Sequence, residues 1–205
     1  MISASLVKEL RLKTGAGMMD CKRALEETNG DLEKAVDYLR TAGIAKAEQK
    51  AIRDTSEGVV ASYIHPGSKM GVLLEVKCET DFVARTDGFK QFVKDIAMHI
   101  AAVAPMVVHR DDMPQAVLDH EKKIYLEQAR QSGKPDHILE KIAKGRLDKF
   151  FAGNVLLEQA FVKDPQKTIG AYLKETVAGL GENIAITRFT RFQLGEMGSA
   201  VSDSA

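Results

Sequence analysis

Residues 57–79 have the sequence EGVVASYIHPGSKMGVLLEVKCE, in which two apolar segments flank the turn-forming loop HPGSKMG. Every second residue of the second segment is apolar: Val72, Leu74, Val76 and Cys78. A period of two is typical of a strand with one buried face. We therefore expect a β-hairpin with strands at about 59–65 and 71–79.

The segment CETDFVART, residues 78–86, ends this alternation. Polar Thr80 and charged Asp81 directly precede apolar Phe82 and Val83, an order that continues neither a strand nor a helix period. A phenylalanine outside both periods has no predicted place in the core. The segment therefore indicates a surface that binds another molecule.

The residues around this hairpin predict an α+β core at 57–194. Residues 87–103 place apolar side chains at helical spacing and predict an amphipathic helix over one face of the sheet. VLLEQAFV (155–162) and GENIAITRFTRFQLG (181–195) are typical of strands on either side of a helix at about 168–180. The expected fold class is α+β with an antiparallel sheet.

Residues 1–43 predict a compact module of three short helices. Ser3 or Ser5 is the expected N-cap of the first helix, which should end at Gly15. The third helix should end at Gly43. So small a module buries little apolar surface, so we expect it to be tethered or docked.

Three other segments complete the predicted organisation. Residues 44–56 begin with many Ala, Lys and Gln residues and predict a helical linker. Residues 114–151 predict two charged helices with narrow apolar stripes, joined near Gly133 and Pro135, which is typical of a helical hairpin that projects into solvent. Residues 195–205 predict a disordered tail.

The charge and apolar content disfavour several classes of protein. Lys plus Arg equals Asp plus Glu at 29 each, so no basic surplus favours nucleic-acid binding. No apolar run is long enough for a membrane helix, and the first ten residues lack the apolar stretch of a signal peptide. We expect a cytoplasmic protein; an organellar origin stays open, although no Arg- and Ser-rich transit segment precedes the first helix.

Candidates for enzyme chemistry are weak. The five histidines show no metal-ligand spacing, and TGAG at 14–17 follows a predicted helix rather than a strand, so it is better read as a turn than as a phosphate loop. Cys21 and Cys78 lie far apart without a Cys-x-x-Cys pattern and are expected to be reduced, half-buried thiols. The carboxylates beside Cys78 should raise its pKa and disfavour a nucleophile. We expect neither a metal nor another cofactor.

The consecutive methionines Met18 and Met19 suggest a second recognition surface. Both cannot point into so small a core, and flexible thioethers are common where proteins bind one another. One buried and one exposed methionine is the alternative. Arg11 lies nearby in the sequence and is assigned to the same surface.

Several motifs resemble bacterial elongation factor Ts, in the order of that family. They are SLVKELRLKTGAGMMDCKRALEETNGDLEKAVDYLR, CETDFVAR, AMHIAA, SGKPDHILEKIAKGRLDKFF, EQAFVKD and GENIAITRF, which together span about residues 5–194. The resemblance implies an N-terminal module like a ubiquitin-associated domain, an α+β core and a protruding coiled-coil hairpin.

The resemblance also implies guanine-nucleotide exchange on elongation factor Tu without covalent catalysis. In the family the Asp-Phe pair, here Asp81 and Phe82, enters the GTPase domain near its magnesium site, and the helix with His99 approaches another domain of the partner. The predicted partner-binding residues are therefore Arg11, Met18, Met19, Thr80, Asp81, Phe82, Val83 and His99.

The chain looks like the short form of the family, because it contains one core subdomain where longer members have two. One subdomain leaves a sheet face or edge that needs a partner, so a homodimer is expected. Two other classes stay open: an adaptor that binds without changing nucleotide release, and an enzyme that uses Cys78 or a histidine.

Overall fold

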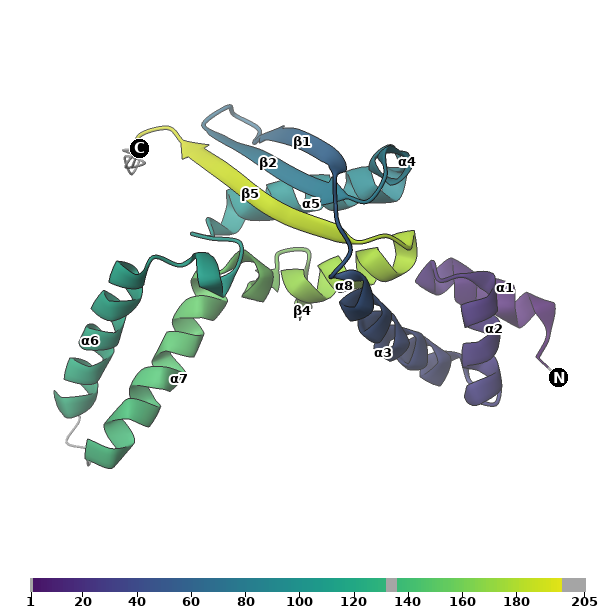
Figure 1. The fold of residues 1–205 in the computed structure, drawn as a ribbon, viewed down its shortest axis with the longest axis horizontal. Coiled ribbons are helices and arrows are strands. Elements are labelled where there is room, and N and C mark those ends of the chain that lie inside the picture. Colours follow the sequence, from purple (N-terminus) through teal and green to yellow (C-terminus); the bar gives the residue numbers. More distant parts are fainter. Residues whose placement is uncertain (1, 132–135, 197–205) are drawn as a thin grey trace. The chain divides into compact units, whose positions relative to one another are not determined.

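The computed structural model describes residues 2–131 and 136–196. The chain forms two compact units, one from residues 1–60, 75–94 and 171–186, the other from 61–74, 95–170 and 187–205. Strands β1 (Glu57–Ile64), β2 (Met70–Cys78) and β5 (Ile184–Gln193) form a sheet in the order β1-β2-β5 (Figure 1). Each of these strands contributes to both units. The predicted hairpin and final strand are thus confirmed.

The alternation in β2 has the predicted structural meaning. Its buried residues are Val72, Leu74, Val76 and Cys78, whereas Leu73 between them is exposed. The backbone N–H of His65 donates to the Met70 carbonyl at 2.9 Å, which closes the hairpin. At the end of β5 the N–H of Leu194 donates to the Lys69 carbonyl at 2.8 Å.

Three helices at the N-terminus share a small core: α1 (Ala4–Thr14), α2 (Met18–Glu27) and α3 (Leu32–Lys50). Ser3 is the N-cap of α1 and accepts from the N–H of Leu6, and Gly15 ends that helix in the left-handed conformation. The buried residues of this core are Val7, Leu10, Cys21, Ala24, Leu25 and Ala35. The likeness to a ubiquitin-associated module stays a prediction.

The predicted end of the third helix at Gly43 is wrong, because α3 continues to Lys50 and contains the first half of the predicted linker. The Ala, Lys and Gln residues after Gly43 are good helix formers. A Cβ at Gly43 would lie 3.2 Å from the Cβ of Ala178 in α8 (Ile169–Leu180). Gly43 therefore allows a close approach of two helices rather than ending one.

The predicted helix at 87–103 is confirmed as α5 (Asp87–Val103). Its buried apolar residues recur at helical spacing: Phe89, Phe92, Val93, Ile96, Ala97, Ile100 and Ala101. The short helix α4 (Asp81–Ala84) precedes α5. Near the C-terminal end of α5, the carbonyl of Ala101 accepts from Nε of Arg191 in β5 at 3.2 Å.

The strand predicted at 155–162 is mostly wrong. Residues Leu156–Glu158 form the 3-10 helix η2, and only Ala160–Phe161 form a strand, β3, which pairs with β4 (Asp164–Thr168). Backbone N–H groups of Glu158 and Gln159 donate to the Val155 carbonyl within this short turn. These local hydrogen bonds replace a sheet ladder, which an apolar run alone does not reveal.

The predicted helical hairpin consists of α6 (Gln115–Gln131) and α7 (Asp136–Asn154), which pack against each other (Figure 1). Its base is a cluster of buried Met113, Phe151 and Val155. Arg110, in the 3-10 helix η1 (Arg110–Asp112), stacks 4.3 Å from the Phe151 ring centroid and pairs with Glu158. The predicted connection at Gly133 and Pro135, and tail residues 197–205, lie outside the described residues.

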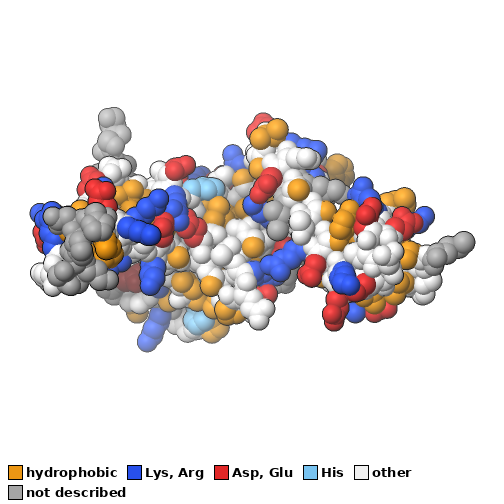
Figure 2. All heavy atoms as spheres, turned by 90° about the horizontal axis from the view of Figure 1, so that it is seen from below, with side chains coloured by type: hydrophobic (Ala, Val, Ile, Leu, Met, Phe, Trp, Pro, Cys, Tyr) orange, Lys and Arg blue, Asp and Glu red, His pale blue; other side chains and the backbone are white. Residues whose placement is uncertain are grey.

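None of the helices in the described ranges combines the length and apolar character needed to cross a membrane. Figure 2 shows basic and acidic side chains interspersed over the face that it draws, in line with the equal totals of the two charges.

Candidate protein-binding site

The irregular segment after β2 forms a single helical turn that presents an aromatic side chain. Thr80 is the N-cap of α4, and its Oγ1 accepts from the N–H of Val83 at 3.4 Å. Asp81 in this turn pairs with Arg85 at 2.8 Å. Phe82 is 78% exposed, whereas Val83 is half-buried. An aromatic side chain this exposed on an ordered turn is suited to insertion into a pocket of another protein.

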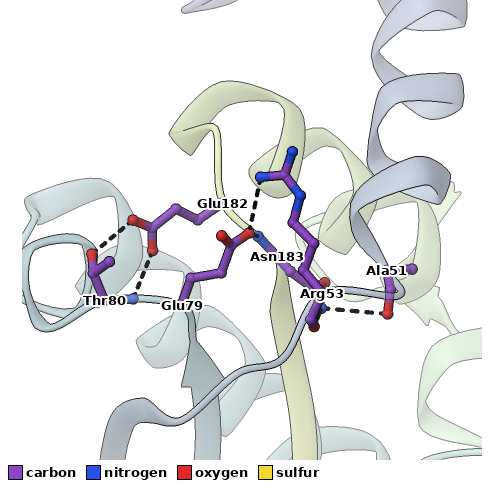
Figure 3. A network of polar contacts seen from close by, with 6 residues as sticks. All are labelled: Ala51, Arg53, Glu79, Thr80, Glu182 and Asn183. Carbon is purple, nitrogen blue, oxygen red and sulfur yellow. Dashed lines mark hydrogen bonds and ion pairs between the residues drawn. The ribbon is translucent and has the colours of Figure 1, made fainter.

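Hydrogen bonds among four residues hold the start of this turn (Figure 3). These residues are Glu79, Thr80, Glu182 and Asn183, and we call them the polar clamp. Thr80 donates to both carboxylate oxygens of Glu182, from its N–H at 3.0 Å and from Oγ1 at 2.7 Å. The neighbouring residues are also joined, because Oε1 of Glu79 accepts from the N–H of Asn183 at 2.6 Å.

The polar clamp also reaches the segment that follows α3. Nδ2 of Asn183 donates to the carbonyl of Arg53 at 2.7 Å and to that of Ala51 at 3.4 Å. The Arg53 guanidinium lies 3.5 Å from Glu79 (Figure 3). Three segments that are far apart in sequence therefore meet behind the Asp81–Phe82 turn.

The second predicted surface lies on the three-helix unit. Met18 and Met19 begin α2 and are 45% and 73% exposed, so the alternative with one buried methionine is wrong. Arg11 on α1 is also exposed. Cys21, one turn further along α2, is the residue that packs in the small core.

The structure does not place His99 on a surface. Its imidazole is fully buried, Nδ1 accepts from the N–H of Val162 at 3.3 Å, and Nε2 lies 3.0 Å from Oε1 of Gln159. Because Nδ1 is an acceptor, Nε2 is the protonated nitrogen that donates to Gln159. Burial lowers the pKa of His99, while the hydrogen bond to Gln159 opposes that shift. His99 was predicted to be a partner-binding residue, and this is corrected for its side chain, which is buried against residues 159–162 and is not available for direct contact with a partner.

Cys78 is fully buried rather than half-buried, and so is Cys21. Burial raises the pKa of the Cys78 thiol, and the charge of Glu182 adds to the increase. The prediction that the pKa of Cys78 is raised is confirmed. It attributed the increase to carboxylates adjacent in sequence, whereas the carboxylate that contributes most is Glu182, which is distant in sequence. Within residues 2–131 and 136–196, no group of three or more His, Cys, Asp and Glu side chains is placed to hold a metal ion.

Sequence reasoning missed Glu182 and Asn183 as parts of this site. The only sign of them in the sequence is that the polar residues Gly181-Glu182-Asn183 directly precede an apolar strand. This pattern does not indicate which segment they contact. Only the pairing of β2 with β5 brings them to Thr80.

An exposed aromatic side chain on a braced turn, together with two exposed methionines, is typical of proteins that act by binding another protein. Comparison with known families matches residues 20–196 to the family described as Elongation factor TS. The chain is 60% identical over 195 residues to elongation factor Ts of Geotalea daltonii, which covers 95% of this chain and 90% of that protein. It is 57% identical over 196 residues to elongation factor Ts of Thermosipho melanesiensis, covering 96% of this chain and all of that protein. The chain belongs to the elongation factor Ts family.

Proposed function

We propose that this protein is a guanine-nucleotide exchange factor that acts on elongation factor Tu in the cytoplasm. It binds the GDP-bound GTPase and promotes release of GDP, so that GTP can bind and translation elongation can continue. Family membership supports the proposal. The observation that carries it is Phe82, which a braced turn exposes beside an acidic residue.

The proposed mechanism is a competition between two binding partners for different states of the GTPase. Backbone amides and Mg²⁺ hold the phosphates of a bound nucleotide, and this arrangement requires one loop geometry. Insertion of Phe82 contributes about 1.5–3 kcal/mol of apolar burial, available only if that geometry changes. Asp81, which pairs with Arg85 in the free chain, then brings a negative charge close to the polar groups around Mg²⁺.

Phe82 alone does not account for efficient exchange. Weakening GDP binding by about ten thousandfold requires a coupling free energy of roughly 5.5 kcal/mol. The surface of Arg11, Met18 and Met19 and contacts of the α+β core supply the remainder. No covalent chemistry and no cofactor of this chain takes part.

Thermodynamic linkage provides the test of this function. If the chain weakens GDP binding by some factor, GDP must weaken binding of the chain by the same factor. We expect titration calorimetry to give a dissociation constant about 10³ to 10⁴ times lower for nucleotide-free than for GDP-bound elongation factor Tu. Equal affinities for the two forms would instead identify an adaptor that binds without exchange.

We also infer a homodimer formed through the sheet. Ile64, Leu73 and Phe192 are exposed apolar side chains on β1, β2 and β5. The side chain of Ile64 covers Gly71, and a Cβ added at Gly71 would lie 2.9 Å from Cδ1 of Ile64. Exposed apolar residues on a sheet favour self-association. Thr190 in β5 is not a cysteine, and Cys21 and Cys78 are both buried, so we expect this dimer to be noncovalent.

Light scattering at micromolar concentration should give twice the chain mass of 22.5 kDa. Replacing Leu73 and Phe192 by lysine should give the monomer mass, because charges would face each other across the interface. Val162→Lys, at an exposed position in the turn between β3 and β4, is the control and should leave the dimer intact. A monomer of the unmodified chain would refute the dimer.

A further inference from the structure

The polar clamp connects the Asp81–Phe82 turn to a residue 102 positions further along the chain. We propose that Glu182 is a positioning residue for this turn: its carboxylate fixes Thr80, and Thr80 fixes the first turn of α4. Glu182 itself need not touch the partner. The inference rests on the proposed function, since it names the residue that orients the inserted side chain.

The Glu182 carboxylate offers Thr80 two hydrogen-bond acceptors. An ionised carboxylate only accepts, and Glu182 receives two hydrogen bonds from the same residue, from the N–H and the hydroxyl of Thr80. The hydroxyl hydrogen is thereby committed to Glu182. The lone pairs of the same oxygen remain free to accept from the N–H of Val83, which is the N-cap bond of α4.

The turn that carries Phe82 is too short to be stable by itself. Helix α4 has four residues, of which Ala84 is the buried one. A single helical turn is unstable in isolation, because fixing the first turn costs more entropy than its one hydrogen bond returns. Thr86 holds the C-terminal end of α4, because its Oγ1 donates to the Val83 carbonyl at 2.8 Å, and Thr80 holds the start of α4. The direction of Phe82 therefore depends in part on what holds Thr80.

The backbone next to Glu182 is itself held by other hydrogen bonds of the polar clamp. The N–H of Asn183 donates to Glu79, and Nδ2 of Asn183 donates to the Arg53 carbonyl. These bonds fix the backbone after Glu182 without using its carboxylate. Removing that carboxylate should therefore release Thr80 while the neighbouring connections remain.

The experiment compares Glu182→Gln with the unmodified protein and with Glu140→Gln. Glutamine keeps the size of the side chain but replaces one acceptor oxygen by a donor and removes the charge, so the two charge-assisted hydrogen bonds from Thr80 are lost. Glu140 is an exposed residue of α7, and its replacement makes the same change in net charge. Glu182→Asp, which keeps the charge but shortens the side chain, is a second variant in case the first does not fold.

The first measurement is amide hydrogen exchange of the free protein. In Glu182→Gln we expect the amides of residues 83–85, which are hydrogen-bonded in the turn, to exchange about tenfold faster, which corresponds to about 1.4 kcal/mol. The amides of α5 should keep their rates. A general loss of stability would raise exchange in both segments, and this separates positioning from a structural role.

The second measurement is the maximal rate at which elongation factor Tu releases a fluorescent GDP analogue. We expect about a tenfold lower maximum for Glu182→Gln, because Phe82 must be ordered during insertion, and no change for Glu140→Gln. Adding Thr80→Val to Glu182→Gln should cost little more than either change alone, since both remove the same connection.

The proposal is overturned if Glu182→Gln leaves the amides of residues 83–85 as protected as in the unmodified protein. It is also overturned if those amides lose protection while the maximal release rate stays the same. If the unmodified protein does not accelerate release at all, the proposed function fails, and the amide measurement still decides whether Glu182 orders the turn.

Discussion

Replacing both Asp81 and Phe82 by alanine should lower the maximal acceleration of GDP release by about 10- to 100-fold. Burial of a phenylalanine side chain contributes about 1.5–3 kcal/mol, and every 1.4 kcal/mol corresponds to a factor of ten. Loss of Asp81 removes the negative charge that would approach the magnesium site. Phe82 is exposed in the free chain, so its replacement leaves no cavity in the core.

The matched control for this prediction replaces another exposed apolar residue and another exposed aspartate. Met106 and Asp111 are both exposed, and neither is among the predicted binding residues. Met106→Ala with Asp111→Ala should leave the release rate unchanged. If the variant with Asp81 and Phe82 replaced accelerates GDP release as much as the unmodified protein, exchange must depend instead on the surface of Arg11, Met18 and Met19 and on contacts of the core.

Gly58→Ala should destabilise the fold by about 2–6 kcal/mol, the combined range of backbone strain and overpacking. Gly58 has a φ of +148°, and a Cβ there would lie 2.3 Å from the Val76 carbonyl oxygen and 2.7 Å from the Cα of Lys77. Both atoms are backbone, so no side chain can move aside. Strands β1 and β2 would have to separate locally.

Thermal unfolding measures this effect, with a decrease of roughly 2–4 °C in the midpoint for each kcal/mol in a chain of this size. Gly67→Ala is the control, since Gly67 also has a positive φ of +94° but no atom within 4 Å of an added Cβ. The difference between the two variants isolates the steric contact. Equal decreases would show that the close approach of the strands is not the cause.

Local periodicity predicted much of the fold. The alternation of Val72 and Leu74 identified β2, and the helical spacing of Phe89 and Phe92 identified α5. Gly43 shows where such rules fail, because a glycine can end a helix or allow a close neighbour, and the sequence does not say which. The run at 155–162 failed for a related reason, since apolar content does not distinguish a strand from a buried turn.

The candidate site could be predicted only where its residues are adjacent in sequence. Phe82 was identifiable because it breaks both periods, and Met18 and Met19 because they are consecutive. His99 was placed on a binding surface by family resemblance, whereas the structure buries it against Gln159. Glu182 was missed because its contact with Thr80 depends on strand pairing across more than a hundred residues.

The most direct test of exchange is the rate at which elongation factor Tu releases a fluorescent GDP analogue as this protein is added in rising concentration. We predict a saturable acceleration of up to about 10³- to 10⁴-fold, the size expected if a coupling free energy of roughly 5.5 kcal/mol acts mainly on the dissociation rate of GDP. Stable binding of this protein to GDP-bound elongation factor Tu, with release no faster than in its absence, would show that it is not an exchange factor.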